Sequence, residues 1–209
     1  MKYLITINKE IIHEYHQYYL KQNPKCRSLP FAKKETIKLF NKNGAPKLTK
    51  SGRQATKKRA ISKKNYKMSD CLYGVLSLNE LLIIQNRQVM NGLKHHWGDL
   101  GIWLAAKYNL SNLKISNCMI EFRVFSETLA KKDNDNIAGG IKYLGDGFFT
   151  QSGMCEDDNY TIINPLLINC DYCKEEPRTE IRISTFDDEL KDVYEKMRIH
   201  AENFKEGAA

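Results

Sequence analysis

The stretch Lys131–Asn159 reads KKDNDNIAGGIKYLGDGFFTQSGMCEDDN and contains five aspartates. It follows Cys118–Phe125, CMIEFRVF, in which apolar residues alternate with period two. This alternation predicts a β-strand. We expect a helix to begin soon afterwards, with Asn136 as its N-cap, because an Asn side chain can accept a hydrogen bond from the first turn. The stretch thus predicts a strand followed by a helix, with a cluster of acids between them.

Asp133 and Asp135 lie two residues apart in this cluster. If the backbone stays extended that far, both carboxylates project to the same side. Two such charges repel unless a cation or a proton lies between them, and carboxylate oxygens attract a hard ion such as Mg²⁺. The alternative is a simple turn, since Asp and Asn are frequent turn residues. A calcium loop is excluded because Ile137 occupies the place of the third oxygen ligand.

The rest of the stretch adds further charged groups to this acidic pair. Lys142 and Asp146 are four residues apart, so both should lie on one face of the predicted helix. After a turn at Gly153 comes a second acidic pair, Asp157 and Asp158. A strand, a D-x-D motif, a helical Lys and a second acidic pair together favour a metal site over a turn.

At this point the chain resembles the RusA-type Holliday-junction resolvases, which are endodeoxyribonucleases of bacteria and their phages. The family pattern is D-x-D-N, a Lys on the next helix, an Asp, a Gly-apolar turn and D-D, and the matching residues are Asp133, Asp135, Asn136, Lys142, Asp146, Gly153, Asp157 and Asp158. The stretch Asn79–Trp103 is similar to the entry segment and first long helix of that family. The likeness covers Cys71–Ser184 and departs from the pattern at Gly139-Gly140, where a helix former is expected.

The resemblance implies an enzyme that hydrolyses a DNA phosphodiester at Mg²⁺, with Mn²⁺ as the alternative ion. Asp133, Asp135 and Asp158 are then expected to hold the metal, and Lys142 to complete the catalytic group by stabilising the phosphate. Asn136, Asp146 and Asp157 are expected to support these residues. The resemblance further implies a homodimer that cuts four-way DNA in recombination and repair, in the cytoplasm of a bacterium or a phage-infected cell.

The fold expected from the chain is α+β, a small mixed β-sheet with packed helices. Strands are predicted at Met1–Ile7 and, after a break at Asn164-Pro165, at Leu166–Ile168. The resemblance implies a final strand at Arg178–Ser184, where the family ends its sheet. Helices are predicted at Glu10–Tyr19, within Ser77–Asn109, and at Asp187–Phe204. In the second of these helices, Trp97, Leu100 and Leu104 form an apolar stripe that should face the core. His13 and His16 are expected to pack against Tyr residues rather than bind a metal. We see no internal repeats.

Basic charge is concentrated in Lys21–Lys67, which carries sixteen Lys and Arg against the single acid Glu35. The segment has a balance of +15, so the rest of the chain carries −7, given a total of +8. We expect a loop-rich arm within a basic extension at residues 1–68, ahead of a nuclease domain at residues 69–209. The arm is expected to contact DNA phosphates through Lys57, Lys58, Arg59, Lys63 and Lys64, with Lys131 and Lys132 gripping the phosphate beside the site. The alternative is a solvated charge run.

Six cysteines are scattered along the chain, and no apolar run is long enough for a membrane span. Cys118 and Cys155 are expected to be buried thiols. Cys170 and Cys173 form a single CxxC motif, for which a surface loop with reduced thiols is favoured over a zinc site because zinc takes four ligands. Two rival functions stay open. One is a Mg²⁺ nuclease that acts on flaps or RNA, and the other is a DNA-binding module without catalysis.

Overall fold

The computed structural model describes residues 2–25, 34–60, 68, 87–127 and 134–185. The chain divides into two compact units, one formed by residues 1–6 and 75–209 and the other by residues 7–74. The first unit has an α+β fold, with a four-stranded sheet in the order β1-β6-β4-β5. The strand predicted at Met1–Ile7, within the predicted basic extension, therefore belongs to the sheet of the first unit. The predicted helix at Asp187–Phe204 lies outside the described residues.

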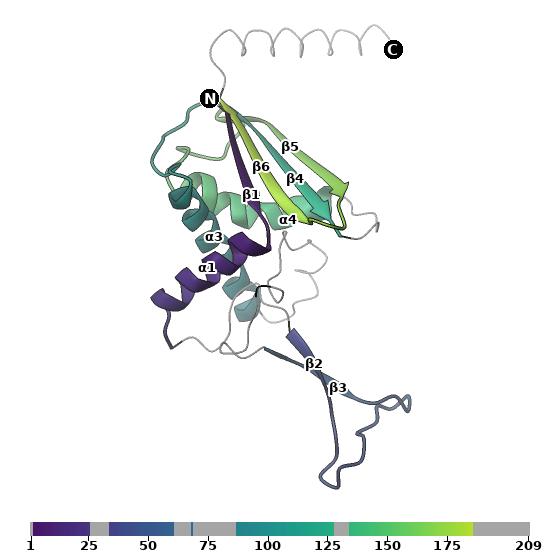
Figure 1. The fold of residues 1–209 in the computed structure, drawn as a ribbon. Coiled ribbons are helices and arrows are strands. Elements are labelled where there is room, and N and C mark those ends of the chain that lie inside the picture. The colour runs from purple at the N-terminus through teal and green to yellow at the C-terminus, as the bar shows by residue number, and fades with distance from the viewer. Residues whose placement is uncertain (1, 26–33, 61–67, 69–86, 128–133, 186–209) are drawn as a thin grey trace, which may run out of the picture. The chain divides into compact units, whose positions relative to one another are not determined.

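The strands of this sheet are β1 (Lys2–Ile7), β4 (Cys118–Ser126), β5 (Ile163–Tyr172) and β6 (Arg178–Thr185) (Figure 1). β4 lies at the centre, antiparallel to β6 and parallel to β5. The sheet is therefore mixed, as predicted. Alternate residues of β4 are buried, including Cys118, Ile120 and Phe122, which confirms the strand predicted from the apolar alternation.

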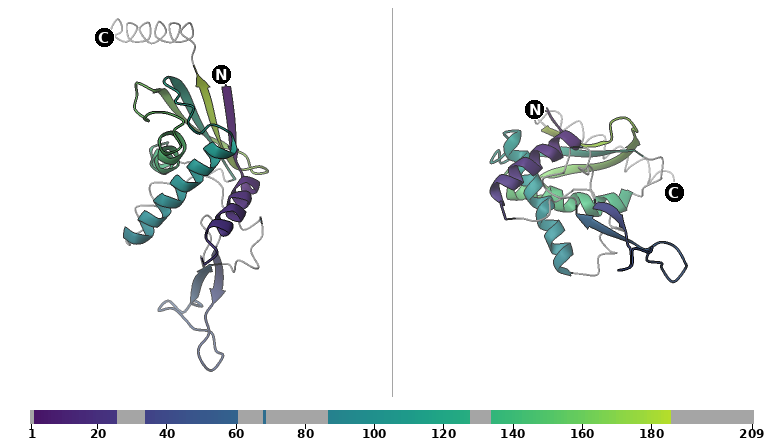
Figure 2. Two further views of the ribbon diagram at one scale, coloured as in Figure 1. Left: turned by 90° about the vertical axis from the view of Figure 1, so that its left-hand side faces the viewer. Right: turned by 60° about the horizontal axis from the view of Figure 1, so that its bottom comes forward.

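Two helices and a π-helical segment form the second layer of this unit: α3 (Arg87–Lys107), α4 (Asn134–Gly145) and η2 (Asp146–Gln151). α3 and α4 lie on the same side of the sheet (Figure 2). The stripe predicted for α3 is confirmed, since Trp97, Leu100 and Leu104 are all buried. The ring of Phe149 in η2 meets that of Phe122 in β4 edge-on, with centroids 6.0 Å apart. Aromatic packing of this kind fixes η2 against the sheet.

The second unit contains α1 (Lys9–Gln22), where the helix predicted at Glu10–Tyr19 is confirmed. The side chain of Asn8 caps it by accepting a hydrogen bond from the backbone of Ile11 at 3.0 Å. His16 is buried, and its ring centroid lies 6.4 Å from that of Tyr15, in keeping with the packing expected of it.

Within the predicted loop-rich arm Lys21–Lys67, residues 34–60 form a β-ribbon, which we call the basic ribbon. Its strands β2 (Lys34–Lys38) and β3 (Thr56–Ala60) pair antiparallel. Gly44 and Gly52 take positive φ angles of 79° and 74° in the chain between the strands. Glycine adopts such angles without steric cost, so the residues that suggested an irregular loop are the turns of the ribbon.

Two predicted boundaries are wrong. β5 spans Ile163–Tyr172, so Asn164-Pro165 interrupts no strand. Proline is tolerated there because β5 is an edge strand, and the register shifts opposite it between Cys118 and Ile120. α4 begins at Asn134 rather than after Asn136, so Asp135 belongs to a helix and not to an extended strand. An acidic residue is favoured in that first turn because the amino end of a helix dipole is positive.

Candidate functional site

Lys142 lies on the outer side of α4, opposite the buried stripe formed by Ile137, Ile141 and Leu144. Its side chain is 65% exposed, and its Nζ atom lies 3.3 Å from the Oδ1 atom of Asp146. This confirms the predicted contact one turn apart. The hydrogen bond and charge of Asp146 raise the pKa of Lys142. Burial opposes this shift, and the charge of Asp158 adds a lesser increase. Lys142 is therefore a cation throughout the neutral range.

Asp146 is held in place by the close packing of η2 against α3. Gly147 lies against the backbone of Gly98, and a Cβ atom built at Gly101 would be 2.5 Å from the carbonyl oxygen of Leu144. Side chains at these glycines would push the two elements apart. A π-helical turn also adds a residue to the helical spacing, and such turns are frequent at functional sites. The main chain beside the Lys142–Asp146 pair is thus set by glycine contacts.

The second acidic pair lies in a loop that is braced by its own hydrogen bonds. Asp157 accepts from the backbone N–H of Asp158 and from the side-chain amide of Asn159, each at 2.8 Å. The bonds from Asn159 and Asp158 lower the pKa of Asp157, although burial opposes the shift. Asp157 thus fixes the loop, while the exposed carboxylate of Asp158 lies within electrostatic range of Lys142.

We call Lys142, Asp146, Asp157 and Asp158 the acidic corner. Lys142 on α4 contacts Asp146 at the start of η2, while Asp157 and Asp158 lie in the loop before β5, from which the charge of Asp158 acts on Lys142. Asp135 is the second residue of α4, and Asn136 the third. The side chains of Asp135 and Asn136 lie outside the described part of the molecule, as do Lys131, Lys132 and Asp133 altogether.

Sheet topology determines how the two acidic pairs are related. Because β5 runs parallel to β4, the loop holding Asp157 and Asp158 lies toward the end of the sheet where β4 begins. α4 follows the opposite end of β4 along the chain, and its residues 135 and 142 are two turns apart on one face, about 10 Å along the axis. Lys142 therefore lies two turns further along α4 than Asp135, and the charge of Asp158 acts on it from the loop.

The donor chemistry of this region suits Mg²⁺. The stretch Lys131–Asn159 contains five aspartates and Glu156 but no histidine, and hard divalent cations prefer such oxygen ligands. Among the described residues no three His, Cys, Asp or Glu side chains are grouped closely enough to hold a metal. Asp133 and the side chain of Asp135 fall outside that set. The expected ligand set of Asp133, Asp135 and Asp158 stays a prediction.

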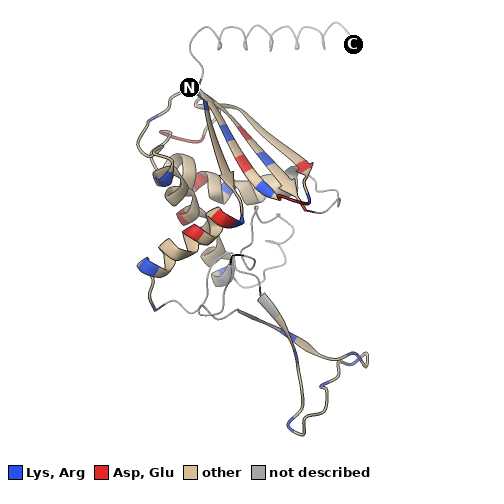
Figure 3. Cartoon of the chain, viewed as in Figure 1, with Lys and Arg blue, Asp and Glu red and all other residues tan. Residues whose placement is uncertain are grey.

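The predicted DNA-contacting residues fall on and beside the basic ribbon. Lys57 is exposed on β3, and Lys58 and Arg59 follow it on the same strand, with side chains that are not described. Lys63 and Lys64 lie outside the described residues. Blue residues recur along the ribbon in Figure 3, and no described part of it is red.

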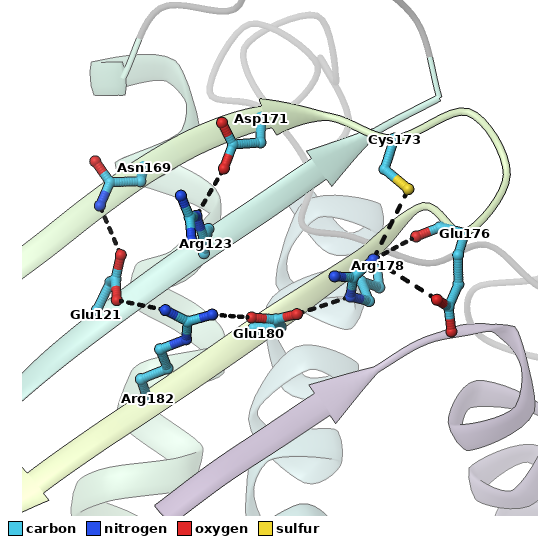
Figure 4. Close-up of polar contacts among 9 residues, drawn as sticks. All are labelled: Glu121, Arg123, Asn169, Asp171, Cys173, Glu176, Arg178, Glu180 and Arg182. Atoms are coloured by element: carbon cyan, nitrogen blue, oxygen red, sulfur yellow. Dashed lines mark hydrogen bonds and ion pairs between the residues drawn. The ribbon is translucent and has the colours of Figure 1, made fainter.

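A network of charged side chains on the sheet was missed from the sequence. Glu180 is only 7% exposed in its side chain and accepts from Arg178 at 2.7 Å and from Arg182 at 2.8 Å (Figure 4). Arg182 also pairs with Glu121 at 3.5 Å. Burial alone would raise the pKa of Glu180, but the two arginines outweigh it and hold the pKa below its ordinary value. The network joins β4 to β6.

The signal for this network was present in the sequence. Acidic and basic residues alternate with the buried apolar residues of β4 and β6, so they all point to the second face of the sheet. Arg123 extends the same face to β5 by pairing with Asp171 at 2.6 Å. Arg178 stacks over Phe125 at 3.9 Å from the ring centroid. The alternation alone does not show which charged residues pair with one another, because that depends on the strand order.

The two predictions about the cysteines have different outcomes. Cys118 and Cys155 are buried, as predicted. Cys170 belongs to β5 rather than to a surface loop, because the strand is longer than expected. Cys173 follows the strand, and its sulfur accepts a weak hydrogen bond from Arg178 at 3.9 Å.

Comparison with known proteins yields no family for this chain. No protein-family model matches it, and neither does any curated protein. Within the described residues, no helix combines the length and apolar character needed to cross a membrane. A function must therefore be inferred from the residues of the chain and their geometry.

Proposed function

We propose that the protein is a Mg²⁺-dependent endodeoxyribonuclease of the RusA type that cuts four-way DNA junctions. One observation carries the proposal: Lys142 lies beside Asp146 and within electrostatic range of Asp158, on a helix whose first turn carries Asp135. In metal-assisted hydrolysis of a phosphodiester, carboxylates bind the metal ion. A nearby cation stabilises the negative charge of the transition state.

Each residue of the site has a distinct part in this proposal. Asp133, Asp135 and Asp158 would hold Mg²⁺, which when bound lowers the pKa of a water molecule and neutralises charge on the phosphate. Lys142 donates to a non-bridging phosphate oxygen, and Asp146 orients it before the substrate arrives. Asp157 supports Asp158 by fixing the loop. Asn136 is proposed to steady the beginning of α4.

DNA capture is assigned to a different part of the chain. The acidic residues repel phosphates, so cations outside the acidic corner must bring the DNA in. The basic ribbon supplies them through its exposed lysines, and Lys131 and Lys132 would grip the phosphate next to the scissile one. A homodimer would provide the two symmetric cuts that a four-way junction requires.

The proposal is tested with purified protein, a synthetic four-way junction and a linear duplex of equal length, each with Mg²⁺ and with a chelator. We expect paired nicks in the junction with Mg²⁺ only, and little cleavage of the duplex. Equal cleavage of flaps or RNA would identify a nuclease of another specificity. Tight junction binding without cleavage under any divalent ion would leave only the DNA-binding module.

A further inference from the structure

The basic ribbon contains two lobes of the same construction between its strands, although no repeat was recognised in the sequence. The first lobe, residues 40–46, is closed by a bridge between Phe40 and Pro46, and the second, residues 48–54, by one between Leu48 and Gln54. In each lobe the glycine four residues after the apolar residue donates its N–H to the residue three before it, at 3.0 Å.

Three backbone hydrogen bonds join the lobes to the stem formed by β2 and β3. Leu39 donates to Ala55, Ala55 to Lys47, and Lys47 to Leu39, at 2.9, 2.6 and 2.9 Å. These three residues are spaced eight apart and close a ring in which each donates once and accepts once. The ribbon is therefore a three-armed structure, with a stem and two equivalent lobes (Figure 1).

The sequence of the lobes repeats in step with the structure. Phe40-Asn-Lys-Asn-Gly44 corresponds to Leu48-Thr-Lys-Ser-Gly52, position by position. Each lobe has an apolar residue, then a polar turn residue, a lysine, a second polar residue and a glycine with positive φ. The polar side chains serve the turns: Asn43 accepts from the backbone of Ala45, and Thr49 bonds to Ser51. The side chains of the apolar residue and of the lysine take no part in these turn contacts.

The apolar residue of each lobe is exposed to solvent. Phe40 is 58% exposed and Leu48 is 60% exposed. Single exposed apolar residues are ordinary on protein surfaces. Here the same position is exposed twice, in lobes held by glycine turns, and each is two residues from a lysine, Lys42 or Lys50. An accidental exposure has no reason to recur at one position of a repeat.

The net positive charge of the basic ribbon indicates which class of partner it binds. Residues 34–60 contain nine basic residues and one acid, Glu35. No ion pair is formed by the six basic residues with described side chains, which are all exposed: Lys38, Lys42, Lys47, Lys50, Arg53 and Lys57. Unpaired cations at this density suit a polyanion, and two apolar side chains offer little area for a lipid surface.

We infer that the two lobes bind DNA at a branch, with Lys42 and Lys50 on backbone phosphates and with Phe40 and Leu48 against unstacked bases. Apolar side chains commonly wedge between base steps, and phenylalanine stacks on exposed bases. Bases at a branch are already partly unstacked. This contact therefore costs less unstacking free energy there than in a continuous duplex. The inference rests on the proposed function for its choice of DNA, and it adds the means by which a branch is distinguished from linear duplex.

Two double variants of the full chain separate the two kinds of contact, in a chelator so that no cleavage occurs. Binding is measured on a four-way junction and a linear duplex over a salt series, with a fluorescent base analogue at the branch. Phe40→Ala with Leu48→Ala is expected to lower junction selectivity about tenfold and to remove the fluorescence change, with duplex affinity retained. Lys42→Gln with Lys50→Gln is expected to weaken binding to both DNAs and to flatten the salt slope by about two.

Matched controls outside the ribbon are Leu113→Ala, at a residue 42% exposed, and Lys174→Gln, at an exposed lysine; both should leave binding unchanged. Full junction selectivity in the apolar double variant would overturn the inference. So would a preference for anionic phosphatidylserine vesicles or for single-stranded RNA over the junction. Absence of cleavage by the wild type with Mg²⁺, together with the expected lobe effects, would reject the nuclease and keep the branch-binding surface.

Discussion

The acidic corner and the basic ribbon handle their charges in opposite ways. In the acidic corner, Lys142 is paired with Asp146, and Asp157 is braced by Asn159, so the charged groups hold one another in position. The described lysines of the ribbon are exposed and form no such pairs. Charges that are positioned by the protein suit chemistry on a bound substrate, and unpaired charges suit the capture of a partner. Changes in the first region should affect turnover, and changes in the second should affect binding.

The largest effect is expected for Asp135→Asn. It removes a negative charge, and with it a ligand of the proposed metal site, while preserving the size of the side chain. We expect junction cleavage at saturating Mg²⁺ to fall by about 100-fold or more, since even groups that only support metal ligands are worth 10–100-fold. Junction binding should be kept or strengthened because repulsion of phosphates falls. Cleavage within tenfold of the wild type would remove Asp135 from the site.

A smaller loss of turnover is expected at Lys142. Lys142→Met should lower cleavage about 100-fold by removing the cation, while Lys142→Arg should retain part of it, since the charge remains but its point geometry is lost. Because its carboxylate neighbours raise the pKa of Lys142, its deprotonation should not limit the rate below pH 10. Cleavage by Lys142→Met within tenfold of the wild type would contradict this assignment. An alkaline limb below pH 10 that disappears in Lys142→Arg would contradict the raised pKa of Lys142.

The ribbon should change binding and leave turnover at saturating DNA nearly unaltered. Replacing Lys38, Lys47 and Lys57 with Gln should weaken junction and duplex binding alike and flatten the salt slope by about three, at roughly 0.9 per phosphate contact. The matched control replaces three exposed lysines outside the ribbon, Lys2, Lys114 and Lys174. A solvated charge run would give the same salt slope in both variants and in the wild type.

The charged network on the sheet offers a third case, in which a buried carboxylate, Glu180, is paired with two arginines. Glu180→Gln should lower the free energy of unfolding by about 2 kcal/mol at neutral pH, because charge-assisted hydrogen bonds from two arginines are lost. Glu180 has a lowered pKa in the fold, so its stabilisation is present above its ordinary pKa of 4.5 and disappears as the pH falls through the folded value. Urea unfolding from pH 7 to pH 3 should therefore show the two proteins converging. A constant difference over that range would contradict the pairing.

The smallest effect is expected at the CxxC motif. Replacing Cys170 and Cys173 together with Ser should leave folding and cleavage near the wild type, apart from a weak bond between Cys173 and Arg178. Elemental analysis provides the check. One zinc ion per wild-type chain, absent from the double variant, would mean that the motif is half of a metal site.

The sequence alone determined the elements whose patterns depend on near neighbours. Period-two alternation identified β1 and β4, and helical spacing identified the stripe of α3 and the shared face of Lys142 and Asp146. These features depend on residues at most a few turns apart, where backbone geometry alone decides which side chains meet.

Only the tertiary structure decided the features that depend on distant partners. Asn164-Pro165 stays within β5 because that strand is at the edge of the sheet, and Glu180 is buried because β4 and β6 bring arginines around it. The turns of Lys21–Lys67 read as loop because each glycine breaks a local pattern, yet hydrogen bonds between residues eight apart arrange them as a repeat. Strand order comes from pairings between residues far apart in the chain, for which neighbouring residues carry no signal.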